Sequence, residues 1–304
     1  MKTMNFIVAA AMLSAVPAMV SCGSKSKSAT DVLTDAIEGA EDGTGLKVKA
    51  NATTDTVLII DGRRVEFCDV ARIFDVDESG DFYMSARAIV PAATSGVTAD
   101  LYNKVSEYFS AVVSPDSVKA VVADTPAKFA AGLDAMGCDF VAAVSPMVGD
   151  TVTAGYMMDV DIRPVYGKVG YTTYAVYADY YTGGAHGTVD TYFETYDNAT
   201  SVPYSFETMF TAEGQRQARV KLVDMIAKDK GQTVDEYLAW VNDFVRPDVP
   251  IKVDNFPVYH VGMTGLGVVF TYPKYSIAAG YEGCPAYVLS FDDVSGLLVE
   301  SLGD

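Results

Sequence analysis

One glycine-rich stretch, YYTGGAHG at residues 180–187, contains the residue types best suited to ligand contact or proton transfer. Its adjacent glycines allow positive backbone angles and the close approach of another group. The stretch would present His186, whose ring can contact a ligand or move a proton. An alternative is a specialised turn in which the His186 ring bonds nearby backbone. We favour the turn, because no Ser–His–Asp or Cys–His arrangement accompanies this histidine.

Two carboxylates, Asp159 and Asp161, stand two residues apart where apolar and polar side chains alternate. On a strand they share one face, so they could form the carboxylate pair of a hydrolase. Solvated strand faces carry the same pattern, and we favour that interpretation. We therefore predict no catalytic residue and no enzymatic activity.

Metal-binding residue types are sparse. His186 and His260 are the only histidines, which limits histidine-based metal sites and general-base chemistry. The stretch DVDESGD at 75–81 resembles a calcium loop, but Ala86 stands where such a loop needs a bidentate Glu, so we interpret it as a hairpin turn. We expect no metal site and no cofactor.

The cysteines beyond residue 22 are widely spaced: Cys68, Cys138 and Cys284. This spacing excludes a zinc ribbon and a thioredoxin-like motif. One disulfide with one free thiol and three separate buried thiols both remain open.

Alternating and helical patterns indicate the elements that must position these residues. Strands are predicted at 57–60, 65–67, 70–76, 82–90, 156–166, 171–181, 188–196, 258–261, 267–272, 275–279 and 286–290. Helices are predicted over 101–112, from Ser114-Pro115, from Thr125-Pro126 to Gly137, around 218–226, from Thr233 to Pro247, and after Ser290 with Val294, Leu297 and Leu298. This order predicts an α+β fold with antiparallel β-sheets and two helical layers.

The N-terminus has the pattern of a bacterial lipoprotein. A short apolar segment interrupted by Pro17 ends in Ser21-Cys22, so residues 1–21 would be a signal peptide and Cys22 would carry the lipid. The alternative is an ordinary secretory signal with a chance cysteine. We expect a flexible tether at 22–51 and one large domain at 52–304, with two intimate lobes at 52–150 and 151–304. The domain would sit in the cell envelope, lipid-anchored outside the cytoplasm, with the outer membrane favoured.

The chain is strongly acidic. Its 304 residues carry a formal net charge of −18, and residues 1–21 contain one base and no acid, so the remainder has 21 bases against 40 acids, or −19. Such a field disfavours nucleic acid and favours basic partners. A solvated acidic surface that aids solubility is the simpler interpretation.

Two segments resemble the RsiV-like family of extracellular domains, also the accessory domain type of the peptidoglycan deacetylase PdaC. The first is the GGAH core of residues 183–186; in the second, family positions are held by Phe270, Tyr275, Ile277, Ala278, Tyr281 and Gly283. The resemblance covers residues 72–298 and implies an α+β extracellular module. In RsiV that module binds lysozyme, and binding licenses the proteolysis that frees a sigma factor. The resemblance includes neither the sigma-binding segment of RsiV nor the deacetylase domain of PdaC.

These observations together predict a membrane-anchored envelope lipoprotein that acts as a non-catalytic binding module. Its partner would be a basic protein such as lysozyme, or a cell-wall glycan, and not nucleic acid. The alternatives are a cell-wall-active hydrolase and a structural envelope lipoprotein with a protein partner. The candidate binding residues are Tyr180, Tyr181, Gly183, Gly184, His186, Tyr275 and Tyr281. For each tyrosine taken singly, a half-buried sheet face is the simpler interpretation.

Overall fold

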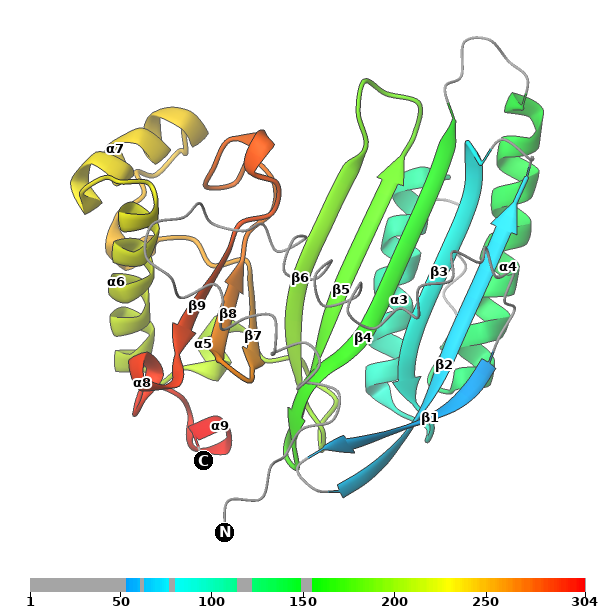
Figure 1. Cartoon of the computed structure of the whole chain (residues 1–304), viewed down its shortest axis with the longest axis horizontal. Coiled ribbons are helices and arrows are strands. Elements are labelled where there is room, and N and C mark those ends of the chain that lie inside the picture. Colours follow the sequence, from blue (N-terminus) through cyan, green and yellow to red (C-terminus); the bar gives the residue numbers. More distant parts are fainter. Residues whose placement is uncertain (1–52, 61–62, 77–79, 114–121, 149–154, 304) are drawn as a thin grey trace, which may run out of the picture.

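The computed structural model describes residues 53–60, 63–76, 80–113, 122–148 and 155–303. They form a six-stranded and a three-stranded sheet with helices packed on both (Figure 1), which confirms the predicted α+β class. Within these ranges, no helix combines the length and the apolar character needed to span a bilayer. Cys22 lies outside the described residues.

The large sheet follows the order of the chain. Its strands are β1 (Thr53–Ile60), β2 (Arg63–Asp75), β3 (Phe82–Pro91), β4 (Tyr156–Lys168), β5 (Tyr171–Tyr181) and β6 (Thr188–Asp197). Neighbours are antiparallel except β3 and β4, which run parallel from the pair Phe82–Tyr156 to the pair Ala88–Ile162. A parallel pair needs a long crossover, and the helical segment between these strands supplies it. Strands from both sides of residue 150 therefore share one sheet.

Two helices in that crossover cover one face of the sheet (Figure 1): α3 (Gly96–Val112) and α4 (Pro126–Val144). Each begins at a capping hydroxyl. Ser95 accepts a hydrogen bond from the backbone N–H of Val97, and Thr125 accepts one from that of Lys128. The short 3-10 segment Ser145–Met147 follows α4.

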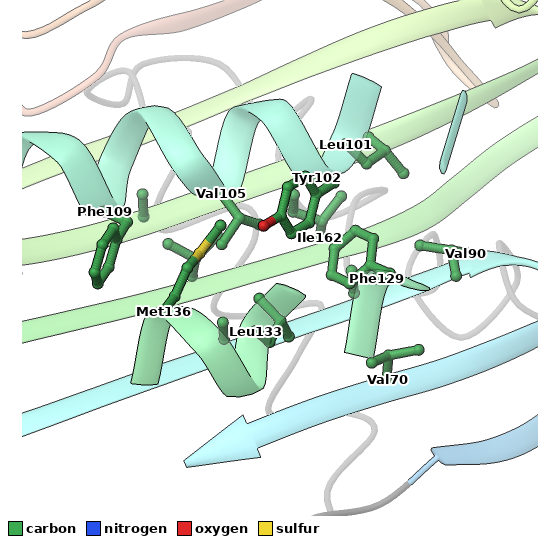
Figure 2. Packing of buried hydrophobic residues seen from close by; sticks show 14 of the residues in the cluster. Val70, Val90, Leu101, Tyr102, Val105, Phe109, Phe129, Leu133, Met136 and Ile162 are labelled. Carbon is green, nitrogen blue, oxygen red and sulfur yellow. The ribbon is translucent and has the colours of Figure 1, made fainter. Parts of the chain in front are cut away.

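Alternate residues of the strands meet these helices in the larger core (Figure 2). On β3 the side chains from Phe82 to Val90 alternate strictly between buried and half-buried, as expected for a strand with one covered face. Between the helices, the rings of Tyr102 and Phe129 pack edge to face, with their centroids 5.5 Å apart.

The C-terminal part forms the smaller unit. Its strands are β7 (His260–Thr264), β8 (Gly267–Thr271) and β9 (Ala286–Ser290). Its helices are α5 (Phe206–Met209), α6 (Ala212–Asp229), α7 (Val234–Val245), α8 (Phe291–Val294) and α9 (Glu300–Gly303), with 3-10 segments at Val253–Asn255 and Gly280–Glu282. Helices α6 and α7 lie on the side of the small sheet away from the large one (Figure 1).

The two units meet along β6 and β7. The backbone N–H of Met263 donates to the Oγ1 atom of Thr195 at 2.8 Å, and the α carbon of Gly262 lies against Phe193. Phe193, Ala175 and Val269 form a small apolar cluster between the two sheets. The large sheet therefore has helices on one face and the small sheet against part of the other.

Most predicted elements are confirmed, and two N-terminal predictions need correction. The β1–β2 hairpin forms as expected, but the stretches 65–67 and 70–76 are one strand, because Cys68 and Asp69 continue the ladder with β3. Helix α4 does not end at Gly137, where the ring of Phe74 packs closely against the helix. The helix start predicted at Ser114-Pro115 lies outside the described residues, as do 77–79 of the calcium-like stretch.

Two C-terminal predictions are wrong. Residues 275–279 form no strand, since Tyr275 has a φ of +68°, which breaks an extended chain. Helix α8 ends at Val294, before Leu297 and Leu298, and Gly296 then takes a φ of +70°. Cys68 and Cys284 are buried whereas Cys138 is exposed on α4, so the alternative of three buried thiols is wrong for Cys138.

Candidate binding surface

The glycine-rich stretch becomes an exposed connection between β5 and β6. Gly183 has a φ of +79°, which an L side chain would strain, and Gly184 and His186 are exposed. The Tyr181 hydroxyl donates to the carbonyl of Gly184 at 2.6 Å, which closes the turn on itself. The Nδ1 atom of His186 lies 3.1 Å from the carbonyl oxygen of Gly187. The contact of the ring with adjacent backbone is the kind that a specialised turn makes.

The other predicted tyrosines lie on the connection between β8 and β9. Tyr281 is 90% exposed and Tyr275 is 54% exposed. The Tyr275 ring packs directly against the α carbon of Gly280, and the Nζ atom of Lys274 lies 5.4 Å from its centroid. A positive φ and a packed ring fix Tyr275 in place while one side of it stays exposed.

The β8–β9 connection reaches the start of β6, directly after the glycine-rich stretch. The Sγ atom of Cys284 donates to the carbonyl oxygen of Val189 at 3.2 Å, and both connections lie at the same end of the molecule (Figure 1). We call residues 181–187 and 274–284 the GGAH end. Tyr180 differs from the other candidates, because its half-buried ring packs 6.0 Å from that of Tyr108 on α3.

The two carboxylates, Asp159 and Asp161, share a face of β4, as their spacing predicts, but they have different partners. Asp161 accepts two hydrogen bonds from Arg163, including 2.7 Å from Nη2, and lies 4.0 Å from Arg87. Asp159 instead stands directly across from Asp179 of β5. The carboxylate pair that the sheet assembles is therefore Asp159–Asp179.

Burial shapes the protonation of this pair. It raises the pKa of Asp159, the charges of Asp161 and Asp179 raise it further, and a hydrogen bond with Ser85 opposes the rise. Burial also raises the pKa of Asp179, opposed by its bond with the Tyr177 hydroxyl. Burial and the two carboxylates raise the pKa of Tyr177 to about 12. A general acid needs a carboxyl group that keeps its proton more readily than usual, and this pair provides one.

Asp159→Asn is expected to stabilise the protein at pH 7. A folded-state pKa above the unfolded value means that ionisation costs folding free energy, and this cost disappears as the pH falls through the folded pKa. The melting temperature should rise by about 2–4 °C at pH 7, as for ~1 kcal/mol in a domain of this size, and by nothing at pH 3.

Asp161→Asn is the matched control on the same face. It relieves the repulsion that the Asp161 charge exerts on Asp159 but also removes the carboxylate that Arg163 holds, so thermal unfolding should show no net gain at either pH. An equal gain from both substitutions would contradict an origin in the burial of the Asp159 carboxyl group.

A second polar cluster, which the sequence does not predict, joins α3, β6 and β7. The Nζ atom of Lys104 lies 2.8 Å from Oε2 of Glu194. The Tyr196 hydroxyl has two acceptors for its single hydrogen, Asp100 at 2.6 Å and Glu194 at 2.9 Å. His260 stacks on the Tyr192 ring with centroids 4.1 Å apart, and its Nδ1 atom is 4.0 Å from Glu194. We call Asp100, Lys104, Tyr192, Glu194, Tyr196 and His260 the junction network.

The charges of the junction network oppose one another. Burial lowers the pKa of His260, as does Lys104, while Glu194 opposes the change. Burial alone would also lower the pKa of Lys104, but the Glu194 carboxylate outweighs it and the pKa is raised. At neutral pH the Lys104 ammonium thus lies beside Glu194 and Asp100, and the stacking of the uncharged His260 ring on Tyr192 is a contact between the two units. Across the described residues, no three His, Cys, Asp or Glu side chains are arranged to hold a metal ion.

Comparison with known proteins bears on the fold. No protein-family model matches the chain, and no curated protein matches it. The chain is similar to a DUF3298 family member from Bacteroides fragilis whose crystal structure is known. The sequence identity is 15% and the TM-score is 0.53, over 83% of this chain and 96% of that chain. The two chains share a fold. A DUF3298 family protein from Pseudomonas aeruginosa is also 15% identical over 83% of this chain and 96% of its own, with a TM-score of 0.46. At 15% identity the likeness shows the fold alone. The roles of the site residues are therefore argued from the geometry of this chain.

Proposed function

We propose that this chain is a non-catalytic binding module of the cell envelope, anchored by a lipid on Cys22, that recognises lysozyme through the GGAH end. The observation that carries the proposal is that His186 and Tyr281 are both exposed, on two connections of which the second reaches the start of β6 through the Cys284–Val189 contact. A cell-wall glycan is the other ligand that the same surface would suit.

Three further features support this proposal. Tyrosine offers rigid, amphipathic contact area at low entropic cost, which suits a recognition surface. The net charge of −19 beyond residue 21 would steer a basic protein toward the domain. DUF3298 is the domain type that RsiV and PdaC carry, which agrees with the resemblance of the GGAH core.

Binding of a lysozyme to residues 29–304 tests the proposal by calorimetry at low and high salt. His186→Ala and Tyr281→Ala should each weaken binding about tenfold, as expected when ~1.4 kcal/mol of contact is lost. Val169→Ala is the matched control and should leave the affinity unchanged, because Val169 is exposed in the turn between β4 and β5, at the other end of β5 from the GGAH end.

The salt dependence of the affinity distinguishes specific recognition from non-specific attraction between opposite charges. Specific binding should weaken at high salt but persist, since the aromatic contacts are not screened. Binding that salt abolishes, or that neither substitution affects, would remove lysozyme recognition by the GGAH end. Calorimetric binding of a series of cell-wall oligosaccharides to the same variants then tests whether the ligand is a glycan.

A second candidate function, hydrolysis of cell-wall glycan, is favoured by one observation. Burial raises the pKa of Asp159, and Asp179 stands opposite it, so the pair offers an acid beside a second carboxylate. Release of reducing ends from peptidoglycan, abolished by Asp159→Asn and retained by Asp161→Asn, would support this function. Absence of release from the unaltered protein would contradict it.

A further inference from the structure

Helix α7 exposes several apolar side chains. Only Tyr237 and Val241 of its twelve residues are buried. Trp240 and Phe244 are 37% and 38% exposed, and Val249, just past the helix, is 67% exposed. We call Trp240, Phe244, Val245 and Val249 the α7 face. Single exposed apolar residues are ordinary, whereas apolar side chains that gather on one surface mark an interaction site, and the Trp240 and Phe244 rings contact each other.

The aromatic part of the α7 face is ordered by stacking. The Trp240 and Phe244 rings are 5.1 Å apart at 8°, and the Tyr237 and Trp240 rings are 6.2 Å apart at 23°. Tyr237 is fully buried and donates to the carbonyl of Ile277 at 3.2 Å. The three rings form a stack that begins in the core and ends at the surface. A partner would therefore meet a preformed surface and lose little side-chain entropy.

Charge around the α7 face selects the partner. Between residues 234 and 249 the chain carries four acids, Asp235, Glu236, Asp243 and Asp248, and one base, Arg246. The Arg246 side chain bends back, with its Nε atom donating to the carbonyl of Asp243. A segment that carries exposed apolar side chains among acidic residues complements a partner segment that is both cationic and apolar. Lys and Arg side chains can also lie over exposed aromatic faces.

We propose that the α7 face is a docking surface for a basic amphipathic segment of a partner protein. The apolar stripe of that segment covers Trp240 and Phe244, and its Lys or Arg side chains lie against Asp243 and Asp248. None of the predicted binding residues lies on α7, and this inference does not depend on lysozyme recognition.

Trp240 is the only tryptophan of the chain, so its fluorescence reports directly on the α7 face. The probe is a Lys/Leu peptide of helical periodicity, with a Glu/Leu peptide of the same pattern as its charge control. The Lys/Leu peptide should shift Trp240 emission to shorter wavelength with saturation, because the indole leaves water. The Glu/Leu peptide should produce no shift.

Variants locate the binding. Phe244→Ser should weaken binding of the Lys/Leu peptide about tenfold, and Asp243→Asn with Asp248→Asn about threefold, the latter effect disappearing at high salt. His186→Ala should bind the peptide as the unaltered protein does, so a failure at the GGAH end leaves this result intact. Far-UV circular dichroism and thermal unfolding verify that each variant is folded.

Three results would overturn the proposal. The first is an unchanged emission spectrum at saturating Lys/Leu peptide. The second is an equal response to the Glu/Leu peptide, which would indicate apolar adhesion without charge selection. The third is a shift with phosphatidylcholine vesicles that the peptide does not produce, which would make the α7 face a membrane contact.

Discussion

Glu194→Leu should destabilise the protein by about 2–4 kcal/mol, because it leaves the Lys104 ammonium without its nearest carboxylate in a largely covered position. The Tyr196 hydroxyl would also lose one of its two acceptors. The loss should appear in urea unfolding at neutral pH as a lower midpoint with an unchanged slope.

A double variant separates the effect of the Lys104–Glu194 ion pair from the other contacts of Glu194. Lys104→Met with Glu194→Leu removes both charges and retains apolar volume, so at least half of the lost stability should return. Persistent full destabilisation of the double variant would mean that Glu194 acts mainly through Tyr196 and His260. An unaffected single variant would contradict a structural role for the junction network.

Phe129→Ala is expected to have the largest effect, a loss of about 3–5 kcal/mol. Its ring is fully buried between α3 and the sheet and packs edge to face on Tyr102 (Figure 2). Truncation leaves a cavity that the surrounding helices can fill only in part. Thermal unfolding should show a melting temperature lower by about 10 °C.

Phe244→Ala is the matched control, since it removes the same side chain from a position that is 38% exposed. It should cost about 1 kcal/mol, mostly from the lost stacking on Trp240. Similar losses from both substitutions would contradict the division between a packed core and an exposed α7 face.

Local chemistry explains which elements the sequence predicts well. The hydroxyl caps at Thr125 and Thr233 fix helix starts that the structure reproduces, because a cap satisfies backbone donors within three residues. Local sequence patterns predict residues 275–279 wrongly. Their apolar pattern is that of a strand, but the packing of Tyr275 on Gly280 bends the chain.

The site could be predicted only where its residues are close in sequence. The turn at 180–187 can be predicted from the sequence, since its glycines and His186 lie close together along the chain. The Asp159–Asp179 pair depends on the register of β4 and β5, which the sequence leaves undetermined. The junction network draws on α3, β6 and β7, and nothing near His260 in the sequence points to Lys104 or Glu194.

The single parallel seam between β3 and β4 has a consequence for how the chain folds. The sets β1–β3 and β4–β6 need only short-range closure, whereas the seam joins Phe82 to Tyr156 across the whole helical crossover. Closure entropy grows with loop length, so the seam should form after both sets, in an order that pulsed hydrogen exchange on β3 amides would report. Until β4 arrives, β3 is an edge with open hydrogen-bonding groups. A chain that emerges N-terminus first is then most prone to aggregate in that interval.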